Sequence, residues 1–533
     1  MSDRAKKARG HAGATTGLFL SGADGAISSV LDLKSLSARF RKSLPVRIYD
    51  NLHSSESINA VRSVVREERL DSVVLAGESP LFYRSARNGD LLLRVLQEEG
   101  MNANRIAIVN LKEQTALPHR ATPLEATRKA SVLIAVGIEK ARLSHDVGMI
   151  EVAPKKTVAV IGTTSGGIYA AQRLLERGFH VAFVDRPRQE KATPASADAM
   201  PTLAYVKNHP HAVFHVAPLE ELYGYAGNFR IHLKGGVRLR AGGIIVAIGD
   251  DLAYTGELYP FLRLERSNEG HFRTIFSDTA VTETVNPGIF LIPHDTPPAS
   301  VIACADSAAL SLDTLLKRHS ITHELFVSEV NQEICGGCGT CIKTCLFHAA
   351  ELDPSSKLST TNIKRCVGCG NCVSACPTGA RDQVSASTEY LLSAIRILAS
   401  YNPPNGIRLL YLLCEGCGYQ SLDFAGREGM EYPTSVMPLS VRCAGRIDTQ
   451  FIIEAFREGF SGVVICKCGD DRCLNIVGNT DLDRRANLFR AVLDSRGISP
   501  ERLRIFGVSN CDGNSCVRGA VDFIEHLRKM GRG

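Results

Sequence analysis

The residues best suited to chemistry in this sequence are its cysteines, which lie in the second half of the chain. The chain has 533 residues and 17 cysteines, none of which precedes Cys304. Thiolates select iron–sulfur clusters, zinc or copper(I). In a cytosolic protein of this length, such a density favours metal or redox chemistry over a disulfide framework.

Eight of the cysteines form two runs with the same spacing, C-x2-C-x2-C-x3-C, and Pro377 follows the second run. This is the spacing of bacterial ferredoxins, in which the fourth cysteine of each run ligates the other run's cluster. We therefore predict two 4Fe–4S clusters with crossed ligands. The ligands are Cys335, Cys338, Cys341 and Cys376 for the first cluster, and Cys366, Cys369, Cys372 and Cys345 for the second.

A pair of zinc sites is the alternative interpretation of these runs, because zinc also uses C-x2-C pairs. A duplicated run of four cysteines with proline after the last is far more typical of ferredoxins. The first run departs from the pattern by having Leu346 where proline is usual, but all four thiols are in place.

A glycine-rich turn near residue 162 predicts a nucleotide site. The segment VAVIGTTSGGIYAAQRLLERGFHVAFVD has the strand, turn, helix and strand of a dinucleotide fingerprint, with Gly162 and Gly167 at the first and third glycine positions. Asp185 ends the second strand, where a ribose-binding acid belongs. Thr164 occupies the second glycine position and crowds the place of a diphosphate. A plain βαβ unit is the alternative, and the turn alone does not say which nucleotide binds.

Further cysteines follow strand-like segments between residues 407 and 533. Cys414 follows RLLYLL, Cys443 follows MPLSVR, and Cys466 and Cys468 follow GVVI. The carboxyl ends of parallel strands share one edge of a sheet, so these thiols should converge. An iron–sulfur cluster, zinc or copper(I) would suit them, and buried structural cysteines with a reactive pair are the alternative.

The elements that must position these residues alternate between strand and helix, which predicts a multidomain α/β protein with mostly parallel sheets. We expect a Rossmann-like nucleotide-binding domain, an inserted two-cluster bacterial ferredoxin module and a C-terminal flavodoxin-like α/β domain. The expected segments are an N-terminal α/β domain at 15–152, the Rossmann-like domain at 153–330, for which the resemblance described below implies FAD, the ferredoxin domain at 331–385, a linker at 386–406 and the C-terminal domain at 407–533.

Charge and hydropathy indicate no nucleic-acid partner and no membrane span. The net charge of +6 is small for this length, and the first 16 residues lack the apolar region of a secretory signal. The longest apolar runs are far shorter than a transmembrane helix. We therefore expect a cytoplasmic protein, with association to a membrane-bound complex left open.

With these motifs in order, the chain from about residue 15 to about 530 resembles the A subunit of heterodisulfide reductases, fused to a domain like the delta subunit of methyl-viologen-reducing hydrogenases. It is also similar to the B subunit of quinone-interacting membrane-bound oxidoreductases. The resemblance is carried by the turn above, the ferredoxin runs and the stretches MPTLAYVKNHPHAVFHVAPLEELYGYAGNFRIHL, LLCEGCGYQ, VRCAGRIDTQFIIEAFREG and VVICKCGDDRCLNIVGN.

The resemblance implies two more cofactors. It implies FAD at the glycine-rich turn, with cofactor-binding residues at Gly162, Thr164, Gly166, Gly167, Asp185, Val216 and Gly249. It implies one 2Fe–2S cluster in the delta-like domain, whose matching positions are one more than a cluster needs: Cys414, Cys417, Cys443, Cys468 and Cys473.

The sequence departs from the family at two other sites. Where the family's N-terminal domain often has cysteines for its own cluster, this chain has Ser21, Ala23, Glu78 and Thr115, so we expect that domain to be structural. A second flavin-binding stretch that ends in a glycine motif in the family has Pro293 and His294 here.

The function that these features predict is electron transfer within a larger oxidoreductase complex. Electrons would pass between a 2Fe–2S centre, two 4Fe–4S clusters and FAD. The expected partners are other subunits, of heterodisulfide-reductase, hydrogenase, formate-dehydrogenase or quinone-linked type. The alternatives are a stand-alone NAD(P)H:acceptor flavin oxidoreductase, which lacks a second nucleotide domain here, and a scaffold subunit with a vestigial flavin site.

Overall fold

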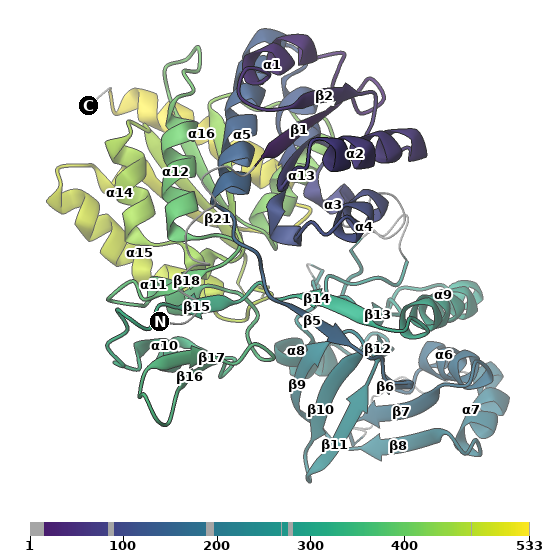
Figure 1. The fold of residues 1–533 in the computed structure, drawn as a ribbon. Helices are drawn as coiled ribbons and strands as arrows, with labels where there is room; N and C mark the ends of the chain where they lie inside the picture. The colour runs from purple at the N-terminus through teal and green to yellow at the C-terminus, as the bar shows by residue number, and fades with distance from the viewer. Residues whose placement is uncertain are drawn as a thin grey trace. The chain divides into compact units, whose positions relative to one another are not determined.

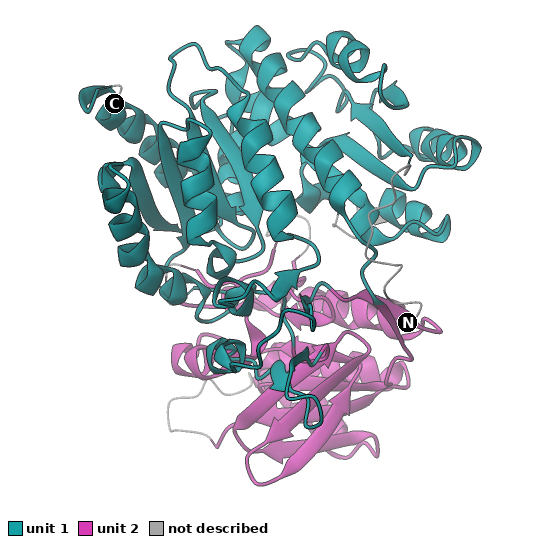
Figure 2. Ribbon diagram, turned by 60° about the vertical axis from the view of Figure 1, so that its left-hand side comes forward, with its two compact units in different colours: residues 1–148, 326–362, 366–533 teal, residues 149–325, 363–365 magenta. Residues whose placement is uncertain are grey.

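The computed structural model describes residues 15–83, 90–187, 197–267, 269–275, 281–470 and 472–531. The chain divides into two compact units (Figure 2). Unit 1 comprises residues 1–148, 326–362 and 366–533, and unit 2 comprises residues 149–325 and 363–365.

Unit 2 is built on a parallel sheet of order β13-β12-β6-β7-β8 (Figure 1). Its strands are β6 (Thr157–Ile161), β7 (His180–Asp185), β8 (Ala212–Val216), β12 (Gly243–Val246) and β13 (Ile289–Leu291). The strand β6, helix α6 (Ser165–Glu176) and strand β7 form the predicted βαβ unit. The parallel sheet confirms the expected Rossmann-like α/β fold of this region.

The remaining elements of unit 2 cover this sheet or extend it. An antiparallel sheet has the order β11-β10-β9, and a two-stranded sheet pairs β14 with β5. Their bounds, with those of the helices, are β5 (Met149–Val152), α7 (Met200–Lys207), β9 (Leu219–Tyr225), β10 (Asn228–Leu233), β11 (Val237–Ala241), α8 (Leu252–Leu262), α9 (Pro298–Leu316) and β14 (Ile321–Glu324).

Helix α9 is the one described helix that is long and apolar enough to cross a membrane by length and composition. Its residues Ala305, Ala308 and Leu312 are fully buried in the core that also contains the apolar side chains of α6 and β6. This packing is that of a core helix in an α/β domain, so we assign α9 no membrane role.

Unit 1 contains two parallel sheets with the same strand order. The first has the order β2-β1-β3-β4 and the second the order β20-β19-β21-β22, so in each the first strand lies between the second and the third. The strands are β1 (Thr16–Ser21), β2 (Val46–Tyr49), β3 (Ser72–Gly77), β4 (Ile106–Asn110), β19 (Leu409–Cys414), β20 (Val436–Val441), β21 (Gly462–Cys468) and β22 (Leu503–Val508).

Helices flank both sheets (Figure 1). Those of the first are α1 (Leu33–Phe40), α2 (Ser55–Glu67), α3 (Pro80–Tyr83), α4 (Asp90–Glu98), the π-helical turn η2 (Lys112–Ala116) and α5 (Pro123–Leu143). Those of the second are α13 (Gly418–Arg427), the turn η5 (Ala444–Arg446), α14 (Thr449–Arg457), α15 (Gly478–Ser495) and α16 (Gly513–Lys529).

The cysteine-rich segment forms short elements only. Strand β15 pairs antiparallel with β18, and β16 with β17. The bounds are β15 (Ser328–Val330), α10 (Thr340–Thr344), β16 (Ala350–Leu352), β17 (Ser359–Thr361), α11 (Asn371–Ser374) and β18 (Arg381–Gln383).

The segment expected as a linker, residues 386–406, is largely a helix. Ser387 caps the N-terminus of α12 (Thr388–Ala399), accepting from the backbone N–H of Tyr390. Leu391, Ile395 and Leu398 bury one face of α12 against α5 and α14. The apolar spacing of four and three residues is that of a core helix, and the Pro-Pro pair lies beyond its C-terminus.

The two sheets of unit 1 share one hydrophobic core, which differs from the separate domains expected at 15–152 and 407–533. Leu20, Val74, Ile395 and Leu412 belong to the same buried cluster. The helix α13 approaches η2 so closely that a Cβ on Gly426 would lie 1.8 Å from the carbonyl oxygen of Glu113. Only glycine permits this contact, which fixes the C-terminal part against the N-terminal part.

Candidate iron–sulfur and nucleotide sites

The four cysteines predicted to hold the first cluster surround one cavity of about 320 Å³. We call them the first ring, and they are Cys335, Cys338, Cys341 and Cys376. Cys341 is carried by α10 and is buried, whereas Cys376 comes from the second run. The lining therefore combines three thiols of the first run with the last thiol of the second.

The other four cysteines line a second cavity, of about 360 Å³. They form the second ring, which consists of Cys345, Cys366, Cys369 and Cys372. Here Cys345 of the first run completes a group from the second run. Four soft thiolate donors around one cavity fit the chemistry of a 4Fe–4S cluster. Among the described residues, no three His, Cys, Asp or Glu side chains are arranged to hold a single metal ion.

The two runs repeat the same backbone conformation. Gly337 and Gly368 both have φ of +66°, and Gly339 and Gly370 have φ of +73° and +80°. These left-handed positions favour glycine and turn each loop around its cavity. The repeated spacing of cysteines in the sequence is thus matched by a repeated loop.

The five cysteines of the delta-like region gather at the carboxyl edge of the second sheet of unit 1. Cys414 and Cys468 end β19 and β21, and their sulfurs lie 3.6 Å apart. The C-terminal cysteine group, all of whose members are buried, consists of Cys414, Cys417, Cys443, Cys468 and Cys473. A Cβ on Gly478 would lie 2.1 Å from the Cys443 sulfur and 3.4 Å from that of Cys473, so only glycine fits beside them.

Hydrogen bonds within the C-terminal cysteine group shift the pKa values of its thiols in opposite directions. Hydrogen bonds with Cys443 and Cys468 lower the pKa of the Cys473 thiol to about 3. The pKa of Cys443 is raised well above its usual range by its hydrogen bond with Cys473 and by burial. Because thiols bind iron in the thiolate form, it is the clustering of these sulfurs that makes the group a soft ligand set.

The second ring lies next to the C-terminal cysteine group. The charge of Cys369 contributes to raising the pKa of Cys443, and Cys369 packs against the core cluster that contains all five C-terminal cysteines. Between them, the fully buried Arg446 contacts the loop of the second run, where a Cβ on Gly370 would lie 2.7 Å from Arg446 Cδ. Sequence reasoning did not single out this arginine.

Four cysteines lie outside these groups. Cys466 and Cys516 are fully buried with their sulfurs 3.8 Å apart, on β21 and α16. Cys511 is exposed, and Cys304 is buried in α9 of unit 2. Cys466 and Cys468 are two residues apart on β21, so the alternation of side chains puts them on one face of the strand, but the sulfur of Cys466 lies beside Cys516 on α16.

The glycine-rich turn of unit 2 lies at the carboxyl edge of its sheet. Gly162 has a φ of +93°, and a Cβ there would lie 2.3 Å from the carbonyl oxygen of Ala247. A Cβ on Gly167 would lie 3.0 Å from the Cβ of Ala247, because α6 packs close to β12 at this point. Thr164 precedes α6 and makes no capping bond, because its hydroxyl donates to the Ala247 carbonyl instead. The first turn of α6 is therefore not closed by its own cap, as pyrophosphate binding requires.

The other residues of the expected flavin site lie along the same edge. Asp185 ends β7 and accepts a hydrogen bond of 2.7 Å from Thr163. Val216, at the end of β8, pairs with Asp185. Gly249 follows β12, and a Cβ on this glycine would lie 3.5 Å from the Thr164 methyl group. Gly166 packs against Ile292. These positions fit a dinucleotide site, although Asp185 is already bonded within the turn.

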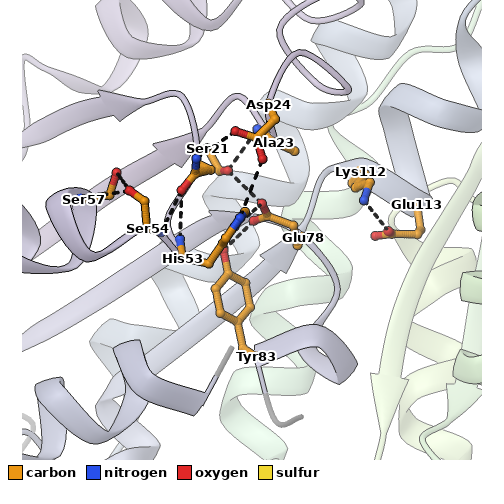
Figure 3. Close-up of polar contacts among 11 residues, drawn as sticks. Ser21, Ala23, Asp24, His53, Ser54, Ser57, Glu78, Tyr83, Lys112 and Glu113 are labelled. Carbon is orange, nitrogen blue, oxygen red and sulfur yellow. Dashed lines mark hydrogen bonds and ion pairs between the residues drawn. The ribbon is translucent and has the colours of Figure 1, made fainter. Parts of the chain in front are cut away.

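The edge of the N-terminal sheet carries a polar network that includes Ser21, Ala23 and Glu78 (Figure 3). Ser21 and Tyr83 both donate to the buried carboxylate of Glu78, at 3.1 and 2.5 Å. His53 lies 3.9 Å from Glu78 and 3.6 Å from Asp24. These side chains pair with one another at this edge of the sheet.

Two buried acids, Glu113 on η2 and Asp423 on α13, interact beside this network. Burial, followed by the charge of Asp423, raises the pKa of Glu113 to about 8. Asn110 lies between them, accepting from the Glu113 backbone N–H and donating 2.8 Å to Asp423. Glu113 Oε1 lies 3.8 Å from Lys112 Nζ (Figure 3), while Oε2 has no hydrogen-bond partner among the described residues.

We expect Glu113→Gln to make the stability of the protein less dependent on pH. The folded protein keeps the Glu113 proton up to about pH 8, whereas the unfolded chain loses it near pH 4.5. The folded state thus binds more protons in this window, so the Glu113 contribution to stability is lost as pH rises. At about 1.4 kcal/mol per pKa unit, the free energy of unfolding of the variant, relative to that of wild type, should rise by at most about 5 kcal/mol between pH 4.5 and 8.

Chemical denaturation at several pH values measures this gain. The exposed Glu67→Gln serves as the control and should run parallel to wild type. A Glu113→Gln difference that stays constant from pH 5 to 8 would contradict the buried protonated carboxyl.

Comparison with known proteins agrees with these sites. Residues 409–531 match the family model of the methyl-viologen-reducing hydrogenase delta subunit, and residues 334–380 match that of the 4Fe–4S dicluster domain. The iron–sulfur D subunit of an F420-non-reducing hydrogenase from Archaeoglobus profundus is 33% identical over 123 residues, which cover 23% of this chain and 90% of that protein.

About half of the chain is similar to the A subunits of heterodisulfide reductases. The A subunit of the ferredoxin:CoB-CoM heterodisulfide reductase from Methanosarcina mazei is 27% identical over 273 residues, or 51% of this chain and 34% of that protein. The chain therefore matches about a third of the length of that relative. A solved thioredoxin reductase from Bacillus anthracis covers 30% of this chain at 11% identity, with a TM-score of 0.21 that supports no argument.

The fold and the cysteine sites define an α/β iron–sulfur protein. Within that class, the chain belongs through residues 409–531 to the methyl-viologen-reducing hydrogenase delta-subunit family, joined to a part homologous to the heterodisulfide reductase A subunit. The predicted fusion of these two families is thus confirmed.

Proposed function

We propose that this chain is an electron-transferring subunit of a multi-subunit, cytoplasmic oxidoreductase complex of heterodisulfide-reductase type. The observation that carries the proposal is the succession of cysteine sites within unit 1: the first ring, the second ring and, next to it, the C-terminal cysteine group. Clusters bound there would supply one-electron transfer.

In this proposal each ring holds one 4Fe–4S cluster, and the C-terminal cysteine group holds one 2Fe–2S cluster with four of its five thiols. FAD binds in unit 2 over Gly162, Thr164, Gly166 and Gly167, beside Asp185, Val216 and Gly249. The ligand set is supported by the crossed linings of the two cavities, and the flavin site by the open first turn of α6.

The partners would be other subunits that donate and accept electrons, because the part of the chain that the structure describes contains one dinucleotide-type sheet only. The test is to purify the chain anaerobically, without partners, and to assay it with NADH or NADPH and an artificial acceptor. We expect no turnover, while a strong one-electron donor such as reduced viologen reduces its clusters. Rapid turnover with NADH or NADPH would favour the stand-alone flavin oxidoreductase instead.

The flavin proposal makes a separate prediction for Asp185→Ala. Because this carboxylate would accept from the adenosine ribose, its loss should lower FAD occupancy several-fold and leave iron content unchanged. FAD and iron per chain are measured on the same preparation. Asp306→Ala, which removes a half-buried acid on α9 of the same unit that pairs with Arg173, is the matched control. Full FAD occupancy in Asp185→Ala would exclude this residue from the site.

A further inference from the structure

Arg381 is the residue that the two ring cavities share. It lies on β18, and its side chain lines both the cavity of the first ring and that of the second. It is only 2% exposed. A charged side chain at this depth needs a counter-charge, because burying an ion without one costs several kcal/mol.

The protein itself gives Arg381 neutral partners. Nη1 donates to the hydroxyls of Thr361 at 3.0 Å and Ser328 at 3.3 Å. Nη2 donates to the Ser359 hydroxyl and the Thr360 carbonyl, both at 2.7 Å. Among the described residues, no carboxylate forms an ion pair with Arg381, and its Nε has no hydrogen-bond partner.

The nearest groups that can carry negative charge are the cysteines of both rings. Arg381 Nη1 lies 3.9 Å from the sulfur of Cys372 in the second ring. Ser359, which accepts from Nη2, lies 3.1 Å from the sulfur of Cys341 in the first ring. The guanidinium therefore faces one buried thiol of each ring, directly or through one hydroxyl.

We propose that Arg381 is the common counter-charge of both 4Fe–4S clusters and raises the reduction potential of each. The proposal rests on the function above, since it requires a cluster in both rings. A cluster gains one negative charge when it is reduced, so a fixed buried cation favours the reduced form. Net charge and hydrogen bonds near the sulfurs are known determinants of cluster potential.

The competing explanation is that Arg381 only ties strands together. Its four hydrogen bonds join β18 to β15 and β17, and a structural clamp would use the same contacts. The two explanations differ for lysine, which keeps the charge but cannot reproduce a planar fork of four bonds.

The test is an EPR-monitored redox titration of the full chain as wild type, R381Q, R381K and K343Q. We expect R381Q to lower the reduction potentials of both clusters. At a fixed ambient potential, the ratio of reduced to oxidised cluster should fall at least tenfold, which corresponds to 59 mV for one electron. R381K should stay within threefold of wild type. So should K343Q, which removes an exposed positive charge from α10.

If R381Q loses its iron, retention of both clusters at near wild-type potentials in R381K supports the proposal. Loss of iron in both variants identifies a structural clamp and overturns it. Unchanged potentials in an iron-replete R381Q, or equal shifts in R381Q and R381K, also overturn it. Wild-type protein that binds no iron under any condition would instead refute the proposed function.

Discussion

Replacing Cys376 by alanine should remove the cluster of the first ring and spare the cluster of the second ring, although Cys376 belongs to the second run of cysteines in the sequence. Two 4Fe–4S clusters and one 2Fe–2S cluster amount to about 10 iron atoms per chain. Cys376 lines the cavity with Cys335, Cys338 and Cys341, so Cys376→Ala should reduce iron to about 6 atoms per chain. The EPR spectrum of the reduced variant should lose the magnetic interaction between the two 4Fe–4S clusters.

Double variants tell which cluster is lost. Adding Cys335→Ala to Cys376→Ala should cost no more iron, because both residues belong to the first ring. Adding Cys366→Ala should cost about four more atoms, since this residue belongs to the second ring. Cys304→Ala, a change at a buried cysteine in α9 of unit 2, is the control and should keep all the iron. The reverse pattern would refute the crossed assignment.

Truncation after residue 404 should unfold much of the remaining unit 1. The cut removes α13, which packs on η2 through Gly426, and α14, which packs on α12. Leu391, Ile395 and Leu398 of α12 would lose part of their burial, and each such side chain contributes about 1.5–3 kcal/mol when fully buried. The second ring would also lose its contact with Arg446.

Hydrogen exchange in β1 and β3 measures the effect. These strands should exchange at least tenfold faster in residues 1–404 than in the full chain, and iron at the second ring should fall. Supplying residues 405–533 as a separate chain should restore part of the protection, which a general defect of the truncated protein would not permit. Native protection and full ferredoxin iron in 1–404 alone would show that the C-terminal part is an independent domain.

The features predicted well from sequence are those whose determinants lie close together along the chain. The C-x2-C-x2-C spacing and its glycines define a local loop, and the loops at Gly337 and Gly368 have the same φ. The βαβ unit around Gly162 is equally local, with its strand, turn and helix within about 30 residues.

The features missed depend on which surfaces pack together. The shared core of unit 1 requires α13 to meet η2 at Gly426, a contact between residues some 300 positions apart that no local pattern contains. Arg381 was missed because a single arginine after the last cysteine has no distinctive spacing. Its burial between two cavities appears only in three dimensions. Asp185 was found, but its bond to Thr163 was not, since hydroxyl orientation follows from the folded turn.

The central claim is that the cysteines of unit 1 hold iron–sulfur clusters, and metal analysis of the anaerobically purified full chain tests it most directly. Iron, zinc and acid-labile sulfide are quantified together, with an EPR spectrum before and after reduction. We predict about 10 iron atoms with matching sulfide, little zinc and signals from reduced clusters. Zinc in place of iron, with no sulfide and no EPR signal, would contradict the claim.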